Sequence, residues 1–410
     1  MNTWITLAIV LVTYAGIAIG HWPRLKANRT TIALMGAGML IATRQIEFSD
    51  IGRFLDMDTL VLLFSMMIIN ANLRIAGFFR LAGGAMLRLA RGPRTFLALE
   101  IILTGVLSAF FLNDTICLMF TPLVLGITLA IKRNPIPYLI ALATAANVGS
   151  TATLTGNPQN MIIGTASGIS YTHFAGTLTP VAFLGLGGIW LVLVKFYPYD
   201  FRPEPFPPLP PDEAEAEVNR PMLIKSLLVL AGLLVAFLLG VPVAEASFLA
   251  ACVLLFTRRL HPEQVFAEFD WSLLVFFAAL FIVTGSLEVN GITAQLSTLS
   301  QGMGTANIWA FSGITVVLSN LVSNVPAVLL LRPVVATLPN PEAGWLVLAA
   351  ASTLAGNLTL LGSVANLIVA EIASRWRVHL GFWEYTKAGL VITLISLLLG
   401  ITWLQIFIWK

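Results

Sequence analysis

A series of apolar runs, each long enough to cross a lipid bilayer, limits the fold of this chain more than any other feature. A helix needs roughly 20 apolar residues to span the hydrocarbon core. Only 10% of the 410 residues are charged, against about 25% in a soluble domain, so lipid must cover much of the surface. The sequence therefore predicts an all-α polytopic membrane protein. Single crossings are expected at 4–20, 29–46, 58–74, 173–196, 222–240, 243–257, 271–287 and 383–407.

Four further apolar segments are interrupted by Gly, Asn or Thr. Those at 94–131 and 305–338 have Asn-containing turns at their centres and are predicted to be re-entrant hairpins. Those at 136–170 and 343–377 are predicted to be broken helices near the midplane. Backbone that leaves helical geometry inside a membrane must be buried or line a wet cavity. We therefore expect these four interruptions to build the functional site.

The two halves of the chain repeat each other. TGVLSAFFLNDTICLMFTP at 104–122 matches TVVLSNLVSNVPAVLLLRP at 315–333, and TLTGNPQNMI at 153–162 matches TLLGSVANLI at 359–368. Each half then has five crossings and one hairpin, and because five is odd the second half must be inverted. Inverted repeats are typical of secondary transporters, whose sites lie at the repeat interface. The expected parts are a first repeat at 1–196, a linker at 197–221 and a second repeat at 222–410.

The positions of Lys and Arg predict the orientation in the membrane. Basic residues cluster at 24–29 and 74–94, which fall on one side of this scheme, whereas 288–304 and 335–344 contain none. By the positive-inside rule the basic side is the cytoplasm. We expect a multi-pass protein of the cell (inner) membrane with external N- and C-termini. The Pro-rich, then acidic, linker 197–221 is expected to be cytoplasmic.

The hairpin tips Leu112–Asn113–Asp114–Thr115 and Ser323–Asn324–Val325–Pro326, with the loops Gly149–Asn160 and Gly356–Asn366, resemble a known family. They are similar to the ion transporter superfamily, which includes arsenite pumps of the ArsB type, NhaD-type sodium/proton antiporters, citrate transporters and divalent-anion/sodium symporters. The resemblance covers nearly the whole chain. It implies a scaffold domain that forms a homodimer, and a transport domain of hairpins and broken helices that moves as an elevator.

The tip motifs bear on the solute. The dicarboxylate symporters have Ser-Asn-Thr at both tips, whereas this chain has Asn-Asp-Thr and then Ser-Asn-Val. An Asn-Asp tip followed by an Asn-hydrophobic-Pro tip is closer to the arsenite pumps. The resemblance therefore implies efflux of arsenite or a similar metalloid hydroxide. Sodium-coupled carboxylate or sulfate transport, and Na⁺/H⁺ exchange, are the alternatives.

Polar residues of the tips and loops are the candidates for binding solute and ions. Asp114 lies in an apolar stretch, and an ionisable group at membrane depth suggests a function. It is expected to bind H⁺ or Na⁺, to cap the following helix, or both. Asn113 and Asn324 are a pseudo-symmetric pair of amides, with a turn role as the alternative, and a Na⁺ site is possible near these three residues. The full candidate set is Asn113, Asp114, Thr115, Thr153, Thr155, Gly156, Asn157, Asn160, Ser323, Asn324, Asn357, Thr359, Gly362, Ser363 and Asn366.

Other charged residues also lie in apolar runs. Three roles are open for Arg332, namely pairing with Glu371, binding the solute, or snorkelling to an interface. Glu100 and Glu245 are expected to be interfacial or paired.

The sequence lacks the motifs of an enzyme. The two cysteines and four histidines have no metal-ligand spacing, and no catalytic set or ATP-binding Gly-rich Lys motif is present. The sequence has no stripe of basic residues of the kind that binds nucleic acid, so no nucleic-acid partner is expected. A channel is a third class, but broken helices in inverted repeats favour alternating access. The chain is therefore predicted to have no catalytic residue, metal or cofactor, and to use H⁺ or Na⁺ as coupling ion. Its expected partners are a small inorganic or organic anion or metalloid hydroxide, the lipid bilayer and a second copy of itself.

Overall fold

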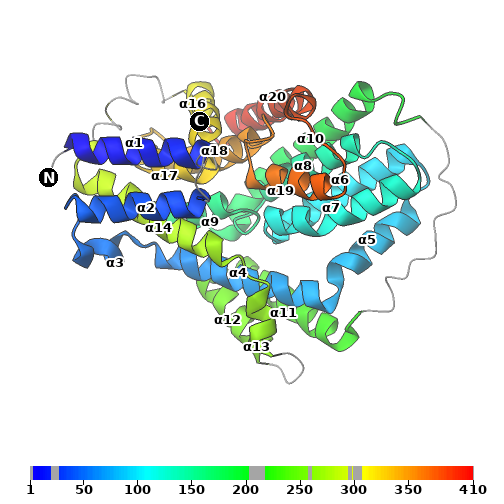
Figure 1. Ribbon diagram of the computed structural model, residues 1–410, viewed down its shortest axis with the longest axis horizontal. Helices are drawn as coiled ribbons and strands as arrows, with labels where there is room; N and C mark the ends of the chain where they lie inside the picture. Colours follow the sequence, from blue (N-terminus) through cyan, green and yellow to red (C-terminus); the bar gives the residue numbers. More distant parts are fainter. Residues whose placement is uncertain are drawn as a thin grey trace.

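The computed structural model is helical and has no strand in the part of the chain that it describes, residues 3–19, 27–202, 218–256, 261–293, 298 and 307–409 (Figure 1). The predicted all-α membrane fold is confirmed. Within those residues, seven helices are long and apolar enough to cross a membrane. They are α4 (Met57–Ala76), α6 (Pro93–Phe110), α7 (Asn113–Ala130), α10 (Tyr171–Phe196), α11 (Arg220–Leu238), α14 (Trp271–Val289) and α20 (Phe382–Phe407).

Shorter helices complete the fold. They are α1 (Thr3–Ile19), α2 (Arg29–Ala42), α8 (Ile136–Ser150), α9 (Pro158–Ser167), α12 (Val243–Leu255), α16 (Ile308–Val322), α17 (Asn324–Val335), α18 (Pro341–Ala355) and α19 (Val364–Arg375). The sequence did not predict the connecting helices η1 (Phe48–Asp50), α3 (Ile51–Phe54), α5 (Phe78–Leu89) and α13 (Pro262–Ala267). Most of the linker, residues 203–217, and parts of the loop after α14 lie outside the described residues.

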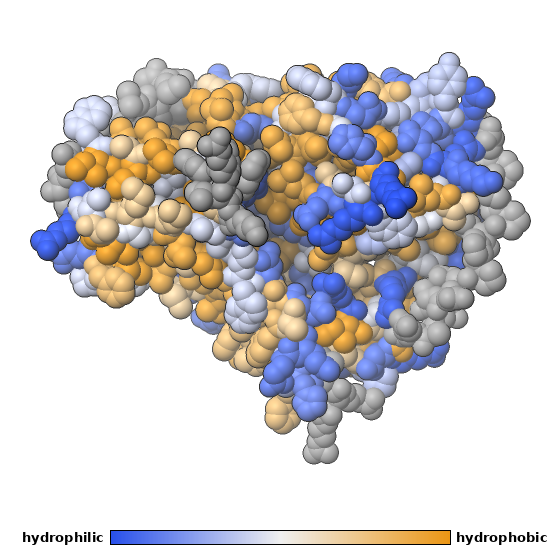
Figure 2. Space-filling model, viewed as in Figure 1, coloured by the Kyte–Doolittle hydropathy of each residue, from blue (hydrophilic) through white to orange (hydrophobic). Residues whose placement is uncertain are grey.

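The helices form two groups that pack mainly within themselves. The scaffold bundle comprises α1, α2, α4, α11, α12 and α14, and the hairpin bundle comprises α6 to α10 and α16 to α20. In Figure 1, α1, α2 and α14 lie side by side at one end, and α6, α7 and α8 lie at the other. Apolar residues are prominent over α1, α2 and α14, whereas polar residues gather at the right edge and lower tip of the same face (Figure 2).

Equivalent helices of the two halves make equivalent contacts. Helix α2 packs on α14 as α12 packs on α4, and α6 packs on α8 as α16 packs on α18. The sequence around the start of α4, Leu55–Val61, also aligns with Phe269–Val275 at the start of α14. Each of these helices follows a short helix and has an aspartate N-cap, Asp56 or Asp270, whose carboxylate accepts a backbone N–H at 3.1 or 3.2 Å. Such caps satisfy donors that the helix itself leaves free.

The segments predicted as hairpins and broken helices interrupt their helices at the polar residues. Phe111 and Leu112 separate α6 from α7, and Ser323, with a φ of 79°, separates α16 from α17. Residues 151–157 separate α8 from α9, and residues 356–363 separate α18 from α19. These four interruptions bring polar backbone and side chains into the interior of an otherwise apolar protein.

Candidate solute-binding site

Both hairpin tips and both broken helices meet at one cavity of about 160 Å³, here called the tip cavity. Helices α7, α9, α17 and α19 all begin there, so four helix N-termini converge on it. The first turns of α2 and α14 close the cavity from the scaffold bundle. Free N–H groups and helix dipoles make such N-termini favourable for anions and for polar solutes that accept hydrogen bonds. The polar residues that line it are Arg29, Thr30, Asn113, Asp114, Gln159, Asp270, Ser272, Ser323, Asn324 and Ser363.

An amide network beside the tip cavity joins the two halves of the chain. At its centre, Oδ1 of Asn147 accepts from Nδ2 of Asn113 at 2.9 Å and from Oγ of Ser363 at 3.1 Å. Its Nδ2 donates to Oδ1 of Asn357 at 2.9 Å and of Asn366 at 3.0 Å. Every hydrogen-bonding position of the buried Asn147 amide is therefore used. Because buried polar groups are costly when unpaired, this network holds the first tip and the second broken helix in register.

Asn160 and Asn366 hold the two breaks in the same way. Nδ2 of Asn160 donates to the carbonyl oxygens of Ser150 at 3.1 Å and Thr153 at 2.9 Å. Nδ2 of Asn366 donates to the equivalent oxygens, those of Gly356 at 2.8 Å and Thr359 at 3.1 Å. These carbonyls lose their helical partners at the breaks, so each amide closes its own unwound turn. Neither asparagine lines the tip cavity.

Asn113 and Asn324 are the first residues of α7 and α17, and both side chains are more than nine-tenths buried. Among the described residues, Oδ1 of each has no hydrogen-bond partner. Both residues line the tip cavity. Two equivalent carbonyl oxygens without partners at one cavity are therefore available to a bound donor or cation.

Asp114 is the second residue of α7 and does not occupy its N-cap position, which is Leu112. Its carboxylate faces the tip cavity together with Arg29 and Asp270, both of which lie close enough to interact with it electrostatically. The capping role considered for Asp114 is thus not the arrangement seen. Its place in the first turn still brings it near the positive end of the helix dipole.

Comparison with known proteins identifies the family. A family model described as a citrate transporter matches residues 14–355. The chain belongs to the citrate transporter family. The expected membership of the ion transporter superfamily is confirmed, and the chain is a membrane transporter rather than an enzyme.

This transporter is similar over nearly its whole length to several proteins with different names. The silicon efflux transporter LSI3 of Oryza sativa subsp. japonica is 32% identical over 92% of this chain and 93% of that protein. The 46 kDa membrane protein of Mycobacterium leprae is 30% identical over 99% and 98%. The putative transporter arsB of Dictyostelium discoideum is 24% identical over 96% and 89%.

Two solved transporters share the fold of this citrate transporter family member. The Alcanivorax borkumensis YdaH transporter superposes with a TM-score of 0.62 at 17% identity, covering 99% of this chain and 97% of that one. Neisseria gonorrhoeae MtrF gives 0.58 at 12% identity, covering 99% and 94%.

The other predicted site residues from the first half of the chain do not line the tip cavity of the transporter. Thr115 lies in an adjoining cavity of about 140 Å³, here called the side cavity, which also contains Asp114 and Asp270. Thr153 donates to the carbonyl of Ala109 and lies within hydrogen-bond distance of Thr155. The Gly156 carbonyl accepts from the backbone of Asn113 at 3.1 Å. Asn157 caps α9 through the backbone of Asn160.

Most of the other predicted site residues from the second half of the chain also lie outside the lining of the tip cavity. Asn357 belongs to the amide network, and the carbonyl of Thr359 is held by Asn366. Gly362 packs so closely on the carbonyl of Gly356 that an added Cβ would lie 2.8 Å from that oxygen. These residues shape the second break, whereas Ser363 lines the tip cavity itself.

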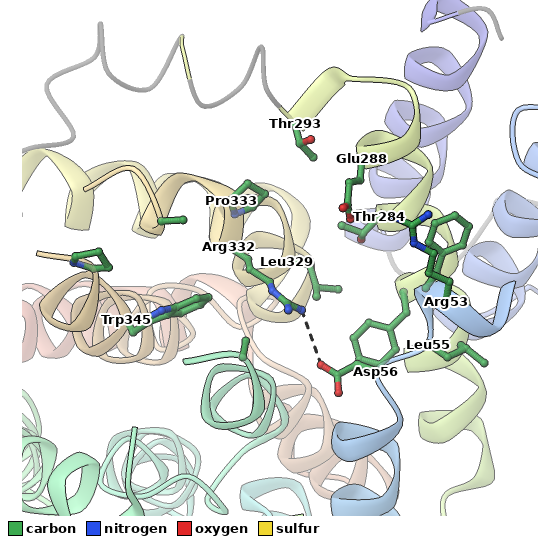
Figure 3. A pocket seen from close by; sticks show the side chains of 16 residues that line it. Arg53, Leu55, Asp56, Thr284, Glu288, Thr293, Leu329, Arg332, Pro333 and Trp345 are labelled. Carbon is green, nitrogen blue, oxygen red and sulfur yellow. Dashed lines mark ion pairs between the residues drawn. The ribbon is translucent and has the colours of Figure 1, made fainter. Parts of the chain in front are cut away.

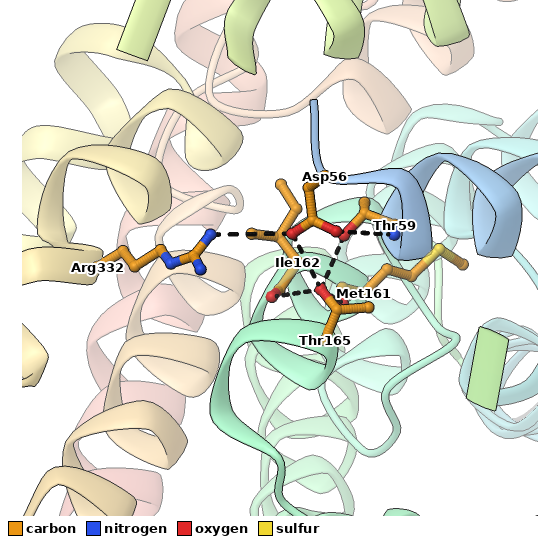
Figure 4. Close-up of polar contacts among 6 residues, drawn as sticks. All are labelled: Asp56, Thr59, Met161, Ile162, Thr165 and Arg332. Carbon is orange, nitrogen blue, oxygen red and sulfur yellow. Dashed lines mark hydrogen bonds and ion pairs between the residues drawn. The ribbon is translucent and has the colours of Figure 1, made fainter. Parts of the chain in front are cut away.

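A third cavity, of about 820 Å³ and here called the Arg332 cavity, lies at the far end of α17 (Figure 3). Nη1 of Arg332 lies 3.8 Å from Oδ2 of Asp56. The same oxygen is 3.4 Å from Oγ1 of Thr165, which in turn lies 2.8 Å from Oγ1 of Thr59 (Figure 4). Since Asp56 caps α4 and Thr59 lies in its first turn, whereas Thr165 and Arg332 belong to the hairpin bundle, these contacts join the two bundles.

The structure excludes one of the three roles left open for Arg332, and the expectation for Glu100 was wrong. Arg332 does not pair with Glu371, because Glu371 forms an ion pair with Arg375 one turn along α19, at 2.7 Å. Glu100 is neither interfacial nor paired. It is fully buried, and both carboxyl oxygens are without a hydrogen-bond partner in the described part of the chain.

Sequence reasoning missed six residues of the site, and two of them, Thr30 and Ser272, are hydroxyl residues in the first turns of α2 and α14. Asn147 is an amide inside the apolar run 136–150. The same pattern identified Asn113, so the sequence could have predicted Asn147 too. Gln159 lies between two predicted residues and donates to Thr353 at 3.2 Å. Arg29 and Asp270 stand at the ends of single crossings, where charges are common, so nothing in the sequence marked them out.

Proposed function

We propose that this protein is an ion-coupled secondary transporter whose solute is arsenite or a similar small metalloid hydroxide. The observation that carries the proposal is the charge of the tip cavity. One arginine, Arg29, and two aspartates, Asp114 and Asp270, are the charged residues among its described lining. A multiply charged anion would meet at least as much negative as positive charge there. A neutral or singly charged hydroxide instead finds hydrogen-bond donors and acceptors in amides and helix N-termini.

The names of two relatives support this solute class, since one is a silicon efflux transporter and another a putative arsB transporter. A second candidate function, sodium-coupled transport of a carboxylate or of sulfate, is supported by the family described as citrate transporters. The convergence of four helix N-termini also suits a carboxylate. Na⁺/H⁺ exchange remains the third alternative.

For the coupling ion we propose a site formed by Asp114 with Oδ1 of Asn113 and Asn324. The support is that both amide oxygens are buried without partners in the described structure and line the same cavity as Asp114. Oxygen ligands of this kind suit Na⁺, and a carboxylate alone suits H⁺. A cation bound there would offset the negative charge of the lining when the solute binds.

The transport step we propose is an elevator movement of the hairpin bundle. Its support is a difference between two equivalent contacts. Asp56 meets α17 at Arg332, whereas its equivalent Asp270 shares two cavities with Asp114, at the start of α7. Position 114 is equivalent to Val325, seven residues before Arg332, or about 10 Å along a helix. If the two halves exchange conformations, the hairpin bundle moves by about this distance.

We retain the expected membrane arrangement as part of the proposal, with external termini, a cytoplasmic linker and a location in the cell membrane. We also propose a homodimer formed by scaffold helices. It is supported by large apolar side chains left exposed on α11 and α12, such as Leu228 and Leu249. A monomeric mass for the purified protein in detergent would contradict the dimer.

The experiment that tests the solute is a binding and uptake screen. The purified protein is exposed to arsenite, silicic acid, sulfate and citrate, each in Na⁺ and in Na⁺-free buffer, and thermal stability and uptake into vesicles are measured. Saturating ligand stabilises a folded protein by mass action, so we expect arsenite or silicic acid to raise the melting temperature and to be transported. Stabilisation and transport with citrate or sulfate alone would replace the proposal by its second candidate.

A further inference from the structure

Glu100 is an ionisable side chain of the hairpin bundle that does not line the tip cavity. Glu100 lies in α6 and is completely buried, on the side near Tyr138 of α8. Helices α6 and α8 pack side by side (Figure 1). Within the described residues, neither of its carboxyl oxygens has a hydrogen-bond partner, and it forms no ion pair. A carboxylate in such surroundings would be an unpaired charge at membrane depth, which is strongly unfavourable. The carboxyl group is therefore neutral here, and neutrality means that it holds a proton.

The neighbouring groups are mainly aromatic. Tyr138 of α8 lies close enough to Glu100 to interact with it electrostatically. The Tyr138 hydroxyl is also buried and has no partner among the described residues. The Tyr138 ring lies 5.2 Å from that of Phe96 and 5.4 Å from that of Phe201, measured between centroids. Two buried polar groups, neither with a hydrogen-bond partner among the described residues, thus lie near each other beside aromatic rings. The charged groups Arg133 and Asp200 also lie near the Tyr138 hydroxyl.

The titratable groups on the elements packed against α6 do not neutralise Glu100. These groups are Tyr138 of α8, Arg80 and Arg88 of α5, Asp114 and Cys117 of α7, and Tyr171, His173 and Lys195 of α10, and neither carboxyl oxygen of Glu100 forms a hydrogen bond with any of them. On α6 itself, the Nε of Arg94 donates to the carbonyl of Phe201 at 2.7 Å. Phe201, at the start of the linker, is fully buried and packs against the ring of Tyr138.

The second repeat shows that the fold does not need a carboxyl group at this place. Position 100 is equivalent to Phe311 of α16, which is also completely buried. An aromatic side chain therefore fills the corresponding position between α16 and α18. The carboxyl group in the first repeat costs stability without a packing reason, and a function that needs a titratable group would explain it.

We propose that Glu100 is a proton-binding site of the hairpin bundle, separate from the tip cavity. In the described conformation the carboxyl group is protonated and closed off by Phe201 and Tyr138. When that cover opens, the proton passes to water and leaves a carboxylate, and the reverse step takes it up again. The ligand is a proton rather than a metal cation, because one carboxyl and one hydroxyl offer too few oxygens to replace a hydration shell. The site does not depend on which solute the transporter carries.

The test uses dicyclohexylcarbodiimide, which reacts with protonated carboxyl groups in apolar surroundings. The carboxyl O–H adds across a C=N bond of the reagent, and no group leaves, so the adduct is found by mass spectrometry of peptides. The full-length protein in lipid vesicles should be labelled at Glu100. Above the pH at which the group titrates, labelling should fall roughly tenfold per pH unit. The exposed Glu245 is the control and should react far less.

Two variants complete the experiment. Glu100→Gln should lose the adduct, and Glu100→Phe, which copies the second repeat, should remain folded. Both should flatten the pH dependence of transport, whereas Glu245→Gln should leave it unchanged. Absence of a Glu100 adduct at every pH would overturn the proposal, as would the wild-type pH dependence in both Glu100 variants. Because labelling needs no solute, its result is independent of the proposed substrate.

Discussion

At the scale of single residues, asparagines with the same sequence signature have different tasks. Asn160 and Asn366 donate to the carbonyls of their own breaks, so their amides stabilise unwound backbone. Within the described residues, Oδ1 of Asn113 and of Asn324 has no hydrogen-bond partner at the tip cavity, so these two oxygens can bind a ligand. The partners of each amide, and not its residue type, decide which task it has.

Asp114→Asn is the substitution that best tests the coupling site. The change keeps the size of the side chain and removes its charge. The variant should fold, because losing one partly buried carboxylate from a helix N-terminus costs at most about 2 kcal/mol. If Asp114 binds the coupling ion, the variant should lose accumulation of solute driven by a Na⁺ or pH gradient. Reconstituted vesicles with and without an imposed gradient provide the measurement.

The matched control for this variant is Asp58→Asn, which removes an exposed carboxylate from the first turn of α4. It should transport like the wild type. Gradient-driven accumulation at the wild-type level in Asp114→Asn would refute a coupling role for Asp114.

At the scale of helices, the starts of α4 and α14 are the informative elements. Both begin at an aspartate N-cap, but Asp56 meets the hairpin bundle at Arg332, and Asp270 meets it at the tip. The equivalent aspartates of the two repeats thus contact the hairpin bundle at different positions along its helices. Such asymmetry is what an inverted repeat needs in order to expose one site alternately to two sides.

Cysteine pairs can detect the exchanged contacts. Thr59 is equivalent to Leu273, which lines the tip and side cavities beside Asp114. In the opposite-facing state, Thr59 should therefore approach Val325. In a protein without Cys117 and Cys252, we expect the pair Thr59→Cys and Val325→Cys to be crosslinked by Hg²⁺ during transport.

The reference pair for this measurement is Leu118→Cys and Leu273→Cys, whose positions both line the side cavity. It should crosslink in the described conformation and block transport. If only the reference pair crosslinks in protein that is actively transporting, the hairpin bundle does not move as proposed.

At the scale of the whole molecule, two bundles meet around the tip cavity, and the described contacts between them are few. One is the group formed by Asp56, Thr59, Thr165 and Arg332. The buried side chains within each bundle are mostly apolar or small. This division allows one bundle to move relative to the other without exposing either core.

The orientation of the whole molecule can be tested by surface labelling. Phe48 and Tyr199 are both strongly exposed, at 77% and 76%. The distribution of Lys and Arg predicts that Phe48 lies outside the cell and Tyr199 in the cytoplasm. In intact cells, a membrane-impermeant maleimide should react with Phe48→Cys and should reach Tyr199→Cys only after lysis. Equal reaction of both before lysis would rule out the proposed topology.

The sequence by itself determined the membrane-spanning character, the repeat and the positions of the four interruptions. These follow from local patterns, since a 20-residue apolar run and an Asn or Gly within it have the same meaning in any fold. Only the tertiary structure decided which polar groups share a cavity. Arg29 and Asp270 come from helix ends of the scaffold, far from Asp114 in sequence. Arg332 forms an ion pair with Asp56, and Glu100 is buried without a hydrogen-bond partner in the part of the chain that the structure describes. These outcomes depend on which faces of distant helices pack together, and apolar helices in lipid carry little pattern that specifies such packing.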